Sequence, residues 1–217
     1  DPALVQSALG EVMAADATLH LCHPFGDLPG PQALYDAAYA PLFNSLPDLE
    51  RRDWIVSAGT DANGHDWIGC AGHYVGTFTR PFLDIPQTGH FAHMRFHEFY
   101  RVEDSRIVEM QAIWDIPELM MQAGAWPMVP SLGREMYISG PASQDGLFFE
   151  ARTATQSAQS LETVIGMLTN LSRHPAEGGP EMMHAEKYWD PRMNWYGPAG
   201  IGTARGVAGF RNWHQIP

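Results

Sequence analysis

A chain of 217 residues with 45% hydrophobic and 18% charged side chains can build a folded core, which excludes the disordered and fibrous classes of protein. The net charge of −12 and the single lysine, Lys187, exclude a basic surface for nucleic-acid phosphates. No apolar run is long enough to cross a bilayer and no charged-then-apolar leader precedes Asp1, so we expect a cytoplasmic protein without nucleic-acid or membrane partners.

The N-terminal part of the chain is predicted to form two helices around a short strand. Apolar spacing predicts a helix over residues 3–15, and the alternation that follows predicts a strand on which His20 and Cys22 share one face. Prolines and glycines end this strand. A second helix is predicted over residues 31–46, kinked or restarted at Pro41.

The pattern then changes to strands. Asn63-Gly64 is a strong hairpin signal between two predicted strands, over residues 50–60 and 65–78. Helices followed by an antiparallel sheet are typical of the α+β class, so we expect a cone-shaped half barrel, a curved sheet with helices closing one side. The two cysteines, Cys22 and Cys70, are too few for a disulfide framework, and we expect buried free thiols.

The next stretch combines ionisable and aromatic residues. It predicts one long strand from Gly72 to about Val102, a turn over residues 103–105, a second strand over residues 106–115 and a short helix from Pro117. A three-residue turn would pair strand residues across the hairpin as follows: Phe99 with Glu109, His97 with Gln111, Arg95 with Ile113, and His93 with Asp115.

This pairing separates the hairpin into two faces. One face would collect six polar residues: His93, Arg95, His97, Glu109, Gln111 and Asp115. The other face would be an apolar surface to be covered: Met94, Phe96, Tyr100, Val108, Met110, Ala112 and Trp114. Because the polar residues are interleaved with Phe99, Ile107 and Ile113, their face indicates a pocket wall better than a solvent surface.

Five short motifs follow one another between residues 72 and 124: GHYVGTF, DIPQTGH, FHEFYRVEDSRIVE, Trp114-Asp115 and MMQAG. Their order and content resemble the SnoaL-like polyketide cyclase group of the NTF2-like superfamily. The resemblance spans residues 18–124 and implies an NTF2-like fold. The chain departs from the pattern at Asp84, where glycine is usual, and at Gln111, where a strand tryptophan often stands.

The resemblance implies an enzyme that needs no cofactor and performs acid/base chemistry on a small or polycyclic carbonyl compound. Aldol-type ring closure is the implied reaction, and isomerisation, dehydration or hydrolysis would use the same pocket. The acid/base aspartate of the group matches Asp115, whose apolar neighbours Ile113 and Ile116 would desolvate a carboxyl that exchanges protons. The alternative that Asp115 caps the helix from Pro117 stays open.

Further polar side chains complete the predicted site. His93, the expected neighbour of Asp115, would polarise a substrate carbonyl as the second catalytic residue. The predicted substrate-binding residues are His73, which matches a histidine motif of the group, and Arg95, His97, Gln111 and His20. His93 and His73 have the alternative role of a satisfied interior residue, and His20 would reach the pocket only if the first strand turns it inward. The rival function is a non-catalytic small-molecule-binding or dimer-forming module, since one fold hosts many functions. A homodimer is expected in either case.

A metal site is not expected. The spacing of His90, His93 and His97 would suit a metal on a helix, but on a strand His93 and His97 stand about 13 Å apart. We therefore predict no metal ligands and no cofactor.

The C-terminal part of the chain begins with a Pro-, Gly- and Ser-rich connection. We expect a first domain over residues 1–126, a linker with one amphipathic helix over residues 127–180, and a further segment over residues 181–217. The order of elements in this last segment repeats that of the N-terminus. The expected equivalences are Asp16 with Asp190, His20 with Asn194, Pro24 with Pro198, Gly26 with Gly200, and Gly30 with Gly206.

This repeat predicts the beginning of a second SnoaL-like module. As given, the repeat stops before its long strands. Two interpretations stay open: a two-domain protein with further residues, or a tail that completes the sheet of another subunit.

Overall fold

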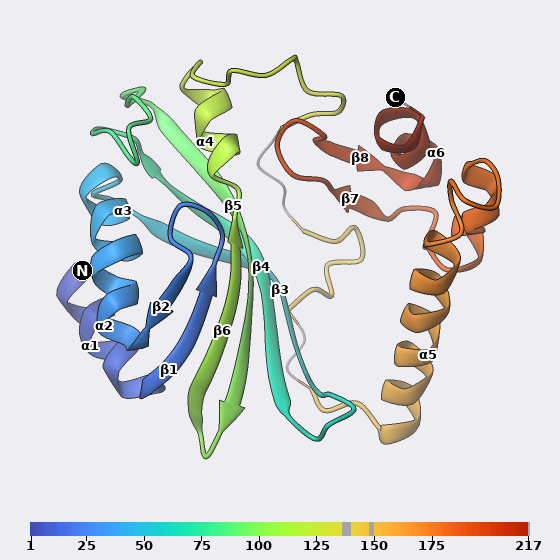
Figure 1. The fold of residues 1–217 in the computed structure, drawn as a ribbon, viewed down its shortest axis with the longest axis horizontal. Helices are drawn as coiled ribbons and strands as arrows, with labels where there is room; N and C mark the ends of the chain where they lie inside the picture. Colours follow the sequence, from blue (N-terminus) through green and yellow to red (C-terminus); the bar gives the residue numbers. More distant parts are fainter. Residues whose placement is uncertain (136–139, 148–149, 217) are drawn as a thin grey trace. The chain divides into compact units, whose positions relative to one another are not determined.

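The computed structural model describes residues 1–135, 140–147 and 150–216, and divides them into two compact units (Figure 1). The first unit is Asp1–Pro127 together with Gly140 and residues 144–147. The second unit holds the remaining described residues. Every helix in the described part of the chain is too short or too polar to span a lipid bilayer.

The first unit is a six-stranded sheet with helices. Its elements are α1 (Pro2–Val12), β1 (Met13–Leu21), β2 (Asp27–Pro29), α2 (Gly30–Leu34), η1 (Tyr35–Tyr39), α3 (Ala40–Ser45), β3 (Glu50–Thr60), β4 (Asp66–Thr77), β5 (Phe91–Glu103), β6 (Arg106–Trp114) and α4 (Ile116–Gln122). The strand order is β2-β1-β6-β5-β4-β3, with β1 and β6 parallel and all other neighbours antiparallel. This open, curved sheet confirms the predicted α+β half barrel.

The predicted helix over residues 31–46 is one helical run in three parts. Pro41 has no N–H to donate, and the run widens into a π-turn, η1, just before it. Within that turn the Ala40 N–H donates to the carbonyl of Tyr35, five residues back. The proline is thus accommodated without ending the helix. The N-terminal helix is shorter than predicted, because Met13 already begins β1.

The prediction of one long strand from Gly72 to Val102 is wrong. β4 ends at Thr77 and β5 begins at Phe91, with a loop of irregular backbone between them. Leu83 and Asp84 adopt left-handed conformations in this loop, with φ of 50° and 65°. A strand cannot continue through such residues, so the loop reverses the chain and β5 returns antiparallel to β4.

The predicted pairing of the β5–β6 hairpin is wrong by two residues. The turn has only two central residues, Asp104 and Ser105, both left-handed as in a type I′ turn, and the ladder shifts again beside Arg101. The observed pairs include Phe99 with Gln111 and His97 with Ile113. A slip of two residues keeps each side chain on its predicted face, because side chains alternate with a period of two.

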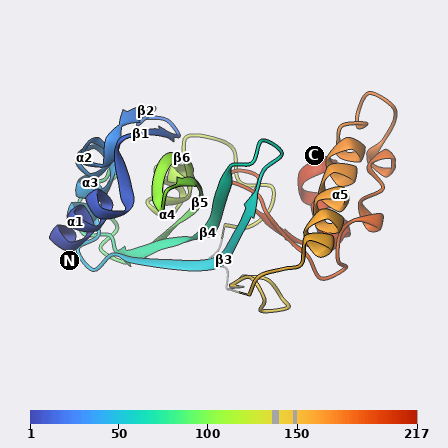
Figure 2. The ribbon, with the colours of Figure 1, turned by 90° about the horizontal axis from the view of Figure 1, so that it is seen from below.

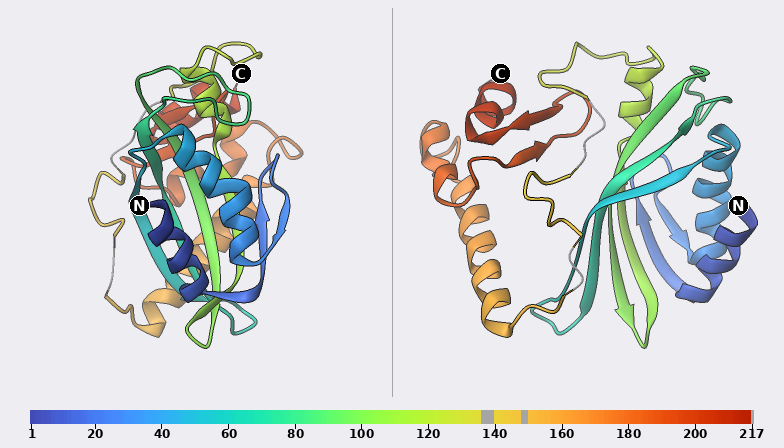
Figure 3. Two further views of the ribbon diagram at one scale, coloured as in Figure 1. Left: turned by 90° about the vertical axis from the view of Figure 1, so that its left-hand side faces the viewer. Right: turned by 180° about the vertical axis from the view of Figure 1, so that it is seen from behind.

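Helices α2 and α3 and the η1 turn cover the face of the sheet predicted to be apolar (Figure 2, Figure 3). We call it the covered face; its central residues are Met94, Phe96, Glu98, Met110 and Trp114. The opposite surface, here called the outer face, carries Arg95, His97, Phe99, Gln111 and Ile113. The face on which the sequence predicts a pocket is therefore the outer face, which these helices leave uncovered.

The second unit begins its regular structure with one long helix. Its elements are α5 (Ala154–Leu171), η2 (Pro180–Met183), η3 (Ala185–Lys187), β7 (Asn194–Tyr196), β8 (Thr203–Arg205), α6 (Gly206–Phe210) and η4 (Arg211–Gln215). Thr153 and Gln156 form a capping box that starts α5. The predicted amphipathic helix is confirmed, and its apolar residues remain exposed in the described structure: Leu161, Val164, Ile165 and Leu168.

Candidate functional site

Asp115 lies at the junction of β6 and α4, where the last strand of the sheet turns into a helix. It is only 8% exposed. Its side chain makes no capping hydrogen bond to α4. The alternative prediction, that the Asp115 carboxylate caps this helix, is therefore wrong. Its backbone N–H donates to the carbonyl of Arg95 across 2.8 Å. The residue across from Asp115 is therefore Arg95, and the predicted pairing with His93 is wrong.

His93 and Arg95 converge on Glu118 of α4. His93 Nδ1 lies 3.3 Å from Glu118 Oε1, and Arg95 Nη2 lies 3.8 Å from the same oxygen. The backbone N–H of Arg95 donates to Glu118 Oε2 across 2.6 Å. Gln122, one turn further along α4, bonds both backbone groups of His93. These contacts fasten α4 to β5 and so fix the position of Asp115 at its start.

His73 is buried beside this cluster and is held as a neutral acceptor. Trp54 donates its indole N–H to His73 Nδ1 across 3.0 Å. Burial lowers the pKa of His73 to about 3, and the nearby positive charge of Arg95 acts in the same direction. Because Nδ1 accepts a hydrogen bond from the indole N–H of Trp54, a neutral His73 ring carries its own proton on Nε2.

The other predicted binding residues are spread over three strands of the sheet, β5, β6 and β1. His97 is half-buried near Trp54, and burial lowers its pKa. Gln111 is exposed and bonds Glu109. His20 is exposed on β1 and pairs with Asp27 of β2 across 2.8 Å. The structure therefore brings His73, His93 and Arg95 together but leaves Gln111 and His20 apart from them, and their substrate-binding roles stay predictions.

Three ligand-type side chains, His73, His93 and Glu118, offer atoms within 4.8 Å of one another. Two features of the cluster oppose a cation. The proton on His73 Nε2 blocks the nitrogen that would have to bind it, and metal-bound histidines usually donate, rather than accept, at their other nitrogen. The guanidinium of Arg95 also neutralises Glu118 already. Both features favour an ion-paired cluster that holds α4, so the absence of a metal ion from this site stays a prediction.

The covered face holds a second polar centre that was not predicted. Glu98 is fully buried and accepts hydrogen bonds from Tyr74 at 2.9 Å, from Trp114 at 2.8 Å and from Tyr100. Arg51 pairs with it across 2.5 Å. Strand alternation alone places Glu98 between Phe96 and Tyr100 on the apolar face. A lone carboxyl at an inward position of an apolar strand is the signal that could have found it.

Aromatic rings surround Glu98. Tyr74 and Trp114 have ring centroids 5.1 Å apart, and Tyr39 lies 5.5 Å from Trp114 with its hydroxyl 2.9 Å from that of Tyr74. Burial raises the pKa of Tyr74 and of Tyr100 well above the usual value, and the charge of Glu98 adds to this. Both phenols therefore stay protonated and act as hydrogen-bond donors to the carboxylate.

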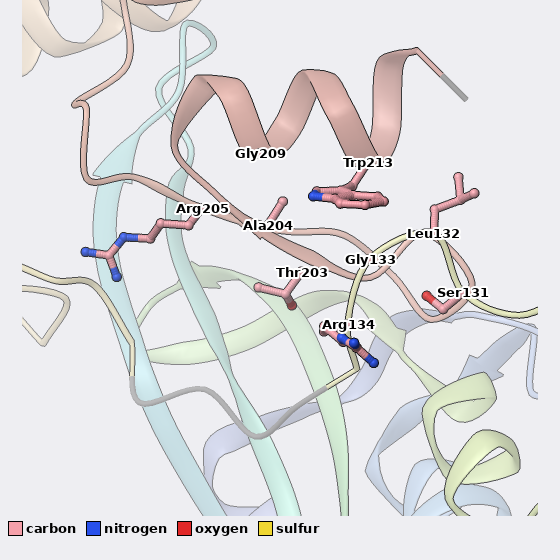
Figure 4. A pocket seen from close by; sticks show the side chains of 9 residues that line it. All are labelled: Ser131, Leu132, Gly133, Arg134, Thr203, Ala204, Arg205, Gly209 and Trp213. Carbon is pink, nitrogen blue, oxygen red and sulfur yellow. The ribbon is translucent and has the colours of Figure 1, made fainter.

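The second unit contains a hollow of about 490 Å³ beside β8 (Figure 4). Its lining residues are Ser131, Leu132, Gly133, Arg134, Thr203, Ala204, Arg205, Gly209 and Trp213. Figure 4 shows the side chains of Arg134 and Arg205 pointing in different directions rather than toward one another. The two cations therefore do not make a joint anion site.

Comparison with solved structures finds similar proteins that are described as polyketide cyclases or as a hydroxylase. IdmH of Streptomyces antibioticus, described as a candidate polyketide cyclase, is 25% identical with a TM-score of 0.47, over 57% of this chain and 89% of IdmH. A candidate SnoaL-like polyketide cyclase of Jannaschia sp. CCS1 is 21% identical with a TM-score of 0.45, over 57% and 80%. AclR of Streptomyces galilaeus, described as a candidate hydroxylase, is 16% identical with a TM-score of 0.46, over 59% and 86%.

Comparison with curated proteins gives no significant match. The sequence profile of the SnoaL-like polyketide cyclases matches residues 6–123, which is more than half of the chain and contains the whole sheet of the first unit. The resemblance of the five motifs is thereby confirmed at the level of the family. The chain belongs to the SnoaL-like polyketide cyclase family.

Proposed function

We propose that the first unit catalyses acid/base chemistry on a small or polycyclic carbonyl compound without a cofactor, and that Asp115 moves the proton. The observation that supports this most is a nearly buried carboxyl at the end of the last strand that is not used to cap the following helix. A carboxyl with little access to water and no helix-capping bond suits proton exchange.

In an aldol ring closure, the Asp115 carboxylate takes a proton from the carbon beside one carbonyl. The resulting enolate carbon attacks a second carbonyl of the same substrate, forming a carbon–carbon bond and an alkoxide. The alkoxide takes a proton from the Asp115 carboxyl, which restores the carboxylate and leaves a ring with a hydroxyl group. All atoms of the substrate are retained, so no oxidant or reductant is consumed.

His93 enters this proposal as a positioning residue rather than as the neighbour that polarises the substrate. Together with Arg95 it holds Glu118, three residues after Asp115, and thereby holds the start of α4. Loss of His93 is expected to lower turnover through displacement of Asp115. The substrate class, the cytoplasmic location and a homodimer are likewise proposed. A dimer is supported by Phe99 and Ile113, which are 49% and 63% exposed on the outer face.

The test is the substitution Asp115→Asn, with turnover measured against a panel of polyketide-like carbonyl compounds. We expect a loss of turnover of about a hundredfold or more, because general acid/base groups contribute on that scale. Asp104→Asn, at the exposed β5–β6 turn, is the matched control. Unchanged turnover in the Asp115 variant would remove this residue from the mechanism.

A non-catalytic binding module is the second candidate. It is favoured by the contacts among Tyr39, Tyr74 and Trp114, which fill the covered face with aromatic side chains. If this candidate holds, compounds of the panel bind to the wild-type chain but are not converted. Direct product analysis by mass spectrometry separates the two functions.

A further inference from the structure

The hollow beside β8 in the second unit has no part in the chemistry proposed for the first unit (Figure 4). Its volume of about 490 Å³ lies within the range of small-molecule sites, which is roughly 300–1,000 Å³. Its walls combine two arginines, Arg134 and Arg205, with a tryptophan, Trp213. A ligand that matches both kinds of wall carries a negative charge and an apolar surface.

One wall of the hollow is the extended segment of residues 131–134, which backbone hydrogen bonds fix in place. The Gly133 N–H donates to the carbonyl of Ile201 across 2.7 Å, and the Thr203 N–H donates to the carbonyl of Arg134 across 2.7 Å. A Cβ on Gly133 would lie only 2.8 Å from the Ile201 carbonyl oxygen, so the two backbones lie in close contact. These bonds form the wall without a ligand, and a ligand that binds there does not have to order it.

Trp213 belongs to the π-turn η4 and extends over the hollow (Figure 4). It is 55% exposed. The other tryptophans of the second unit, Trp189 and Trp195, pack against Phe210 with ring centroids 4.8 and 4.7 Å apart. Trp213 has no such ring partner within the described residues. An exposed indole at the edge of a hollow is suited to stack on a planar ring of a ligand.

The two arginines of the hollow differ from the others in having no side-chain partner. Within the part of the chain that the structure describes, the guanidinium groups of Arg134 and Arg205 make no hydrogen bond, ion pair or ring contact. The other arginines have such a partner, as Arg211 has in Glu186. The chain has a net charge of −12, so two unpaired cations at one hollow give this surface a local charge opposite to that of the whole.

Of the two arginines, Arg134 is the one that can pair with an anionic group of a ligand stacked on Trp213. Figure 4 shows the guanidinium of Arg134 on the side of Ser131, whereas the side chain of Arg205 extends away from Trp213. The nearest carboxylate in the sequence, that of Glu135, is already bonded. It accepts from Ser131 Oγ across 2.5 Å and from a backbone N–H across 3.1 Å.

We propose that the hollow beside β8 binds a planar aromatic carboxylate, with its ring stacked on the indole of Trp213 and its carboxylate paired with the guanidinium of Arg134. Arginine suits this group because its planar fork can donate two parallel N–H groups to the two carboxylate oxygens. The ligand is bound without any covalent step. The proposal does not rest on the catalytic role of Asp115.

Isothermal titration calorimetry of the full chain with 2-naphthoate tests the site. The matched probe is 2-naphthamide, which has the same rings without the charge. We expect the wild-type chain to bind 2-naphthoate at least about fivefold more tightly than 2-naphthamide, because only the carboxylate forms a charge-assisted pair with Arg134. Arg134→Gln should remove this preference. Arg205→Gln changes an arginine of the same hollow and is the control that should keep it.

Two substitutions of Trp213 test the stacking. Trp213→Leu should weaken the binding of both probes by about fivefold, and Trp213→Phe should stay within about twofold of wild type because it keeps an aromatic face. Circular dichroism confirms that each variant is folded. No binding of 2-naphthoate at millimolar concentration, or equal effects of Arg134→Gln and Arg205→Gln, would overturn the proposal. Unchanged binding in Trp213→Leu would also overturn it.

Discussion

Trp54 and His73 share one hydrogen bond, 3.0 Å long, in which the indole N–H donates to Nδ1 of the buried imidazole. This bond exists only while His73 is neutral, since a protonated ring would direct a second N–H at the donor. The pairing ties the stability of the first unit to pH, because the folded state resists protonation of His73 while the unfolded chain does not.

The first prediction is a loss of stability in mild acid. The pKa of His73 is lowered from 6.5 to about 3, so the unfolded chain binds more protons between these values. The stabilisation is present above pH 6.5 and is lost as pH falls toward 3. We expect His73 alone to reduce the free energy of unfolding by about 2 kcal/mol between pH 7 and pH 5.

Urea unfolding at the two pH values measures this loss. His73→Gln is expected to flatten the pH dependence, and His20→Gln, which changes an exposed histidine, is expected to keep the wild-type dependence. A wild-type slope in His73→Gln would show that other groups cause the acid sensitivity.

The second prediction concerns the carboxylate at the centre of the covered face. Glu98→Gln removes the charge that pairs with Arg51 and directs an amide N–H₂ group at neighbouring donors. Breaking a buried ion pair in this way should lower the free energy of unfolding by about 3 kcal/mol. Glu103→Gln, at the exposed end of the same strand, is the control and should stay within about 0.5 kcal/mol of wild type. Equal stabilities of the two variants would show that the Glu98 network contributes little.

The third prediction concerns Gly72 in β4, which lies under the ring of Phe96. A Cβ at this position would come within 2.3 Å of the Arg52 carbonyl oxygen and 2.6 Å of Phe96 Cζ. Gly72→Ala should therefore destabilise the first unit by about 2 kcal/mol through overpacking. Gly59→Ala, where a Cβ meets nothing within 4 Å, should be nearly neutral. Thermal unfolding of both variants makes the comparison, and a neutral Gly72→Ala would show that β3 can shift to make room.

The fourth prediction is that zinc does not stabilise the chain. His73, His93 and Glu118 lie close together, but Arg95 pairs with Glu118 and Trp54 fixes the proton of His73. Added Zn²⁺ should leave the unfolding midpoint unchanged to within about 1 °C, since only a ligand that binds the native state raises it. A rise that grows with zinc concentration and disappears in His73→Gln would establish a metal site after all.

The sequence alone determined which side chains share a face of the β5–β6 hairpin. Alternation with a period of two places Met94, Phe96 and Trp114 together and keeps Arg95 and His97 opposite, even when the pairing is displaced by two residues. The motifs between residues 72 and 124 likewise indicated the family, because each is a run of consecutive residues that can be recognised without knowledge of the fold. The order of the other helices and strands of the first unit followed from the same local patterns, but the break between β4 and β5 did not.

Only the tertiary structure decided which residues meet across the β5–β6 turn. The register depended on two left-handed residues at Asp104 and Ser105, and periodicity does not report such backbone conformations. The convergence of His93 and Arg95 on Glu118 depended on how α4 folds back over β5, a long-range contact with no local signature. Burial of Glu98 needed partners from three other strands, since a carboxylate is tolerated inside a core only where distant donors satisfy it.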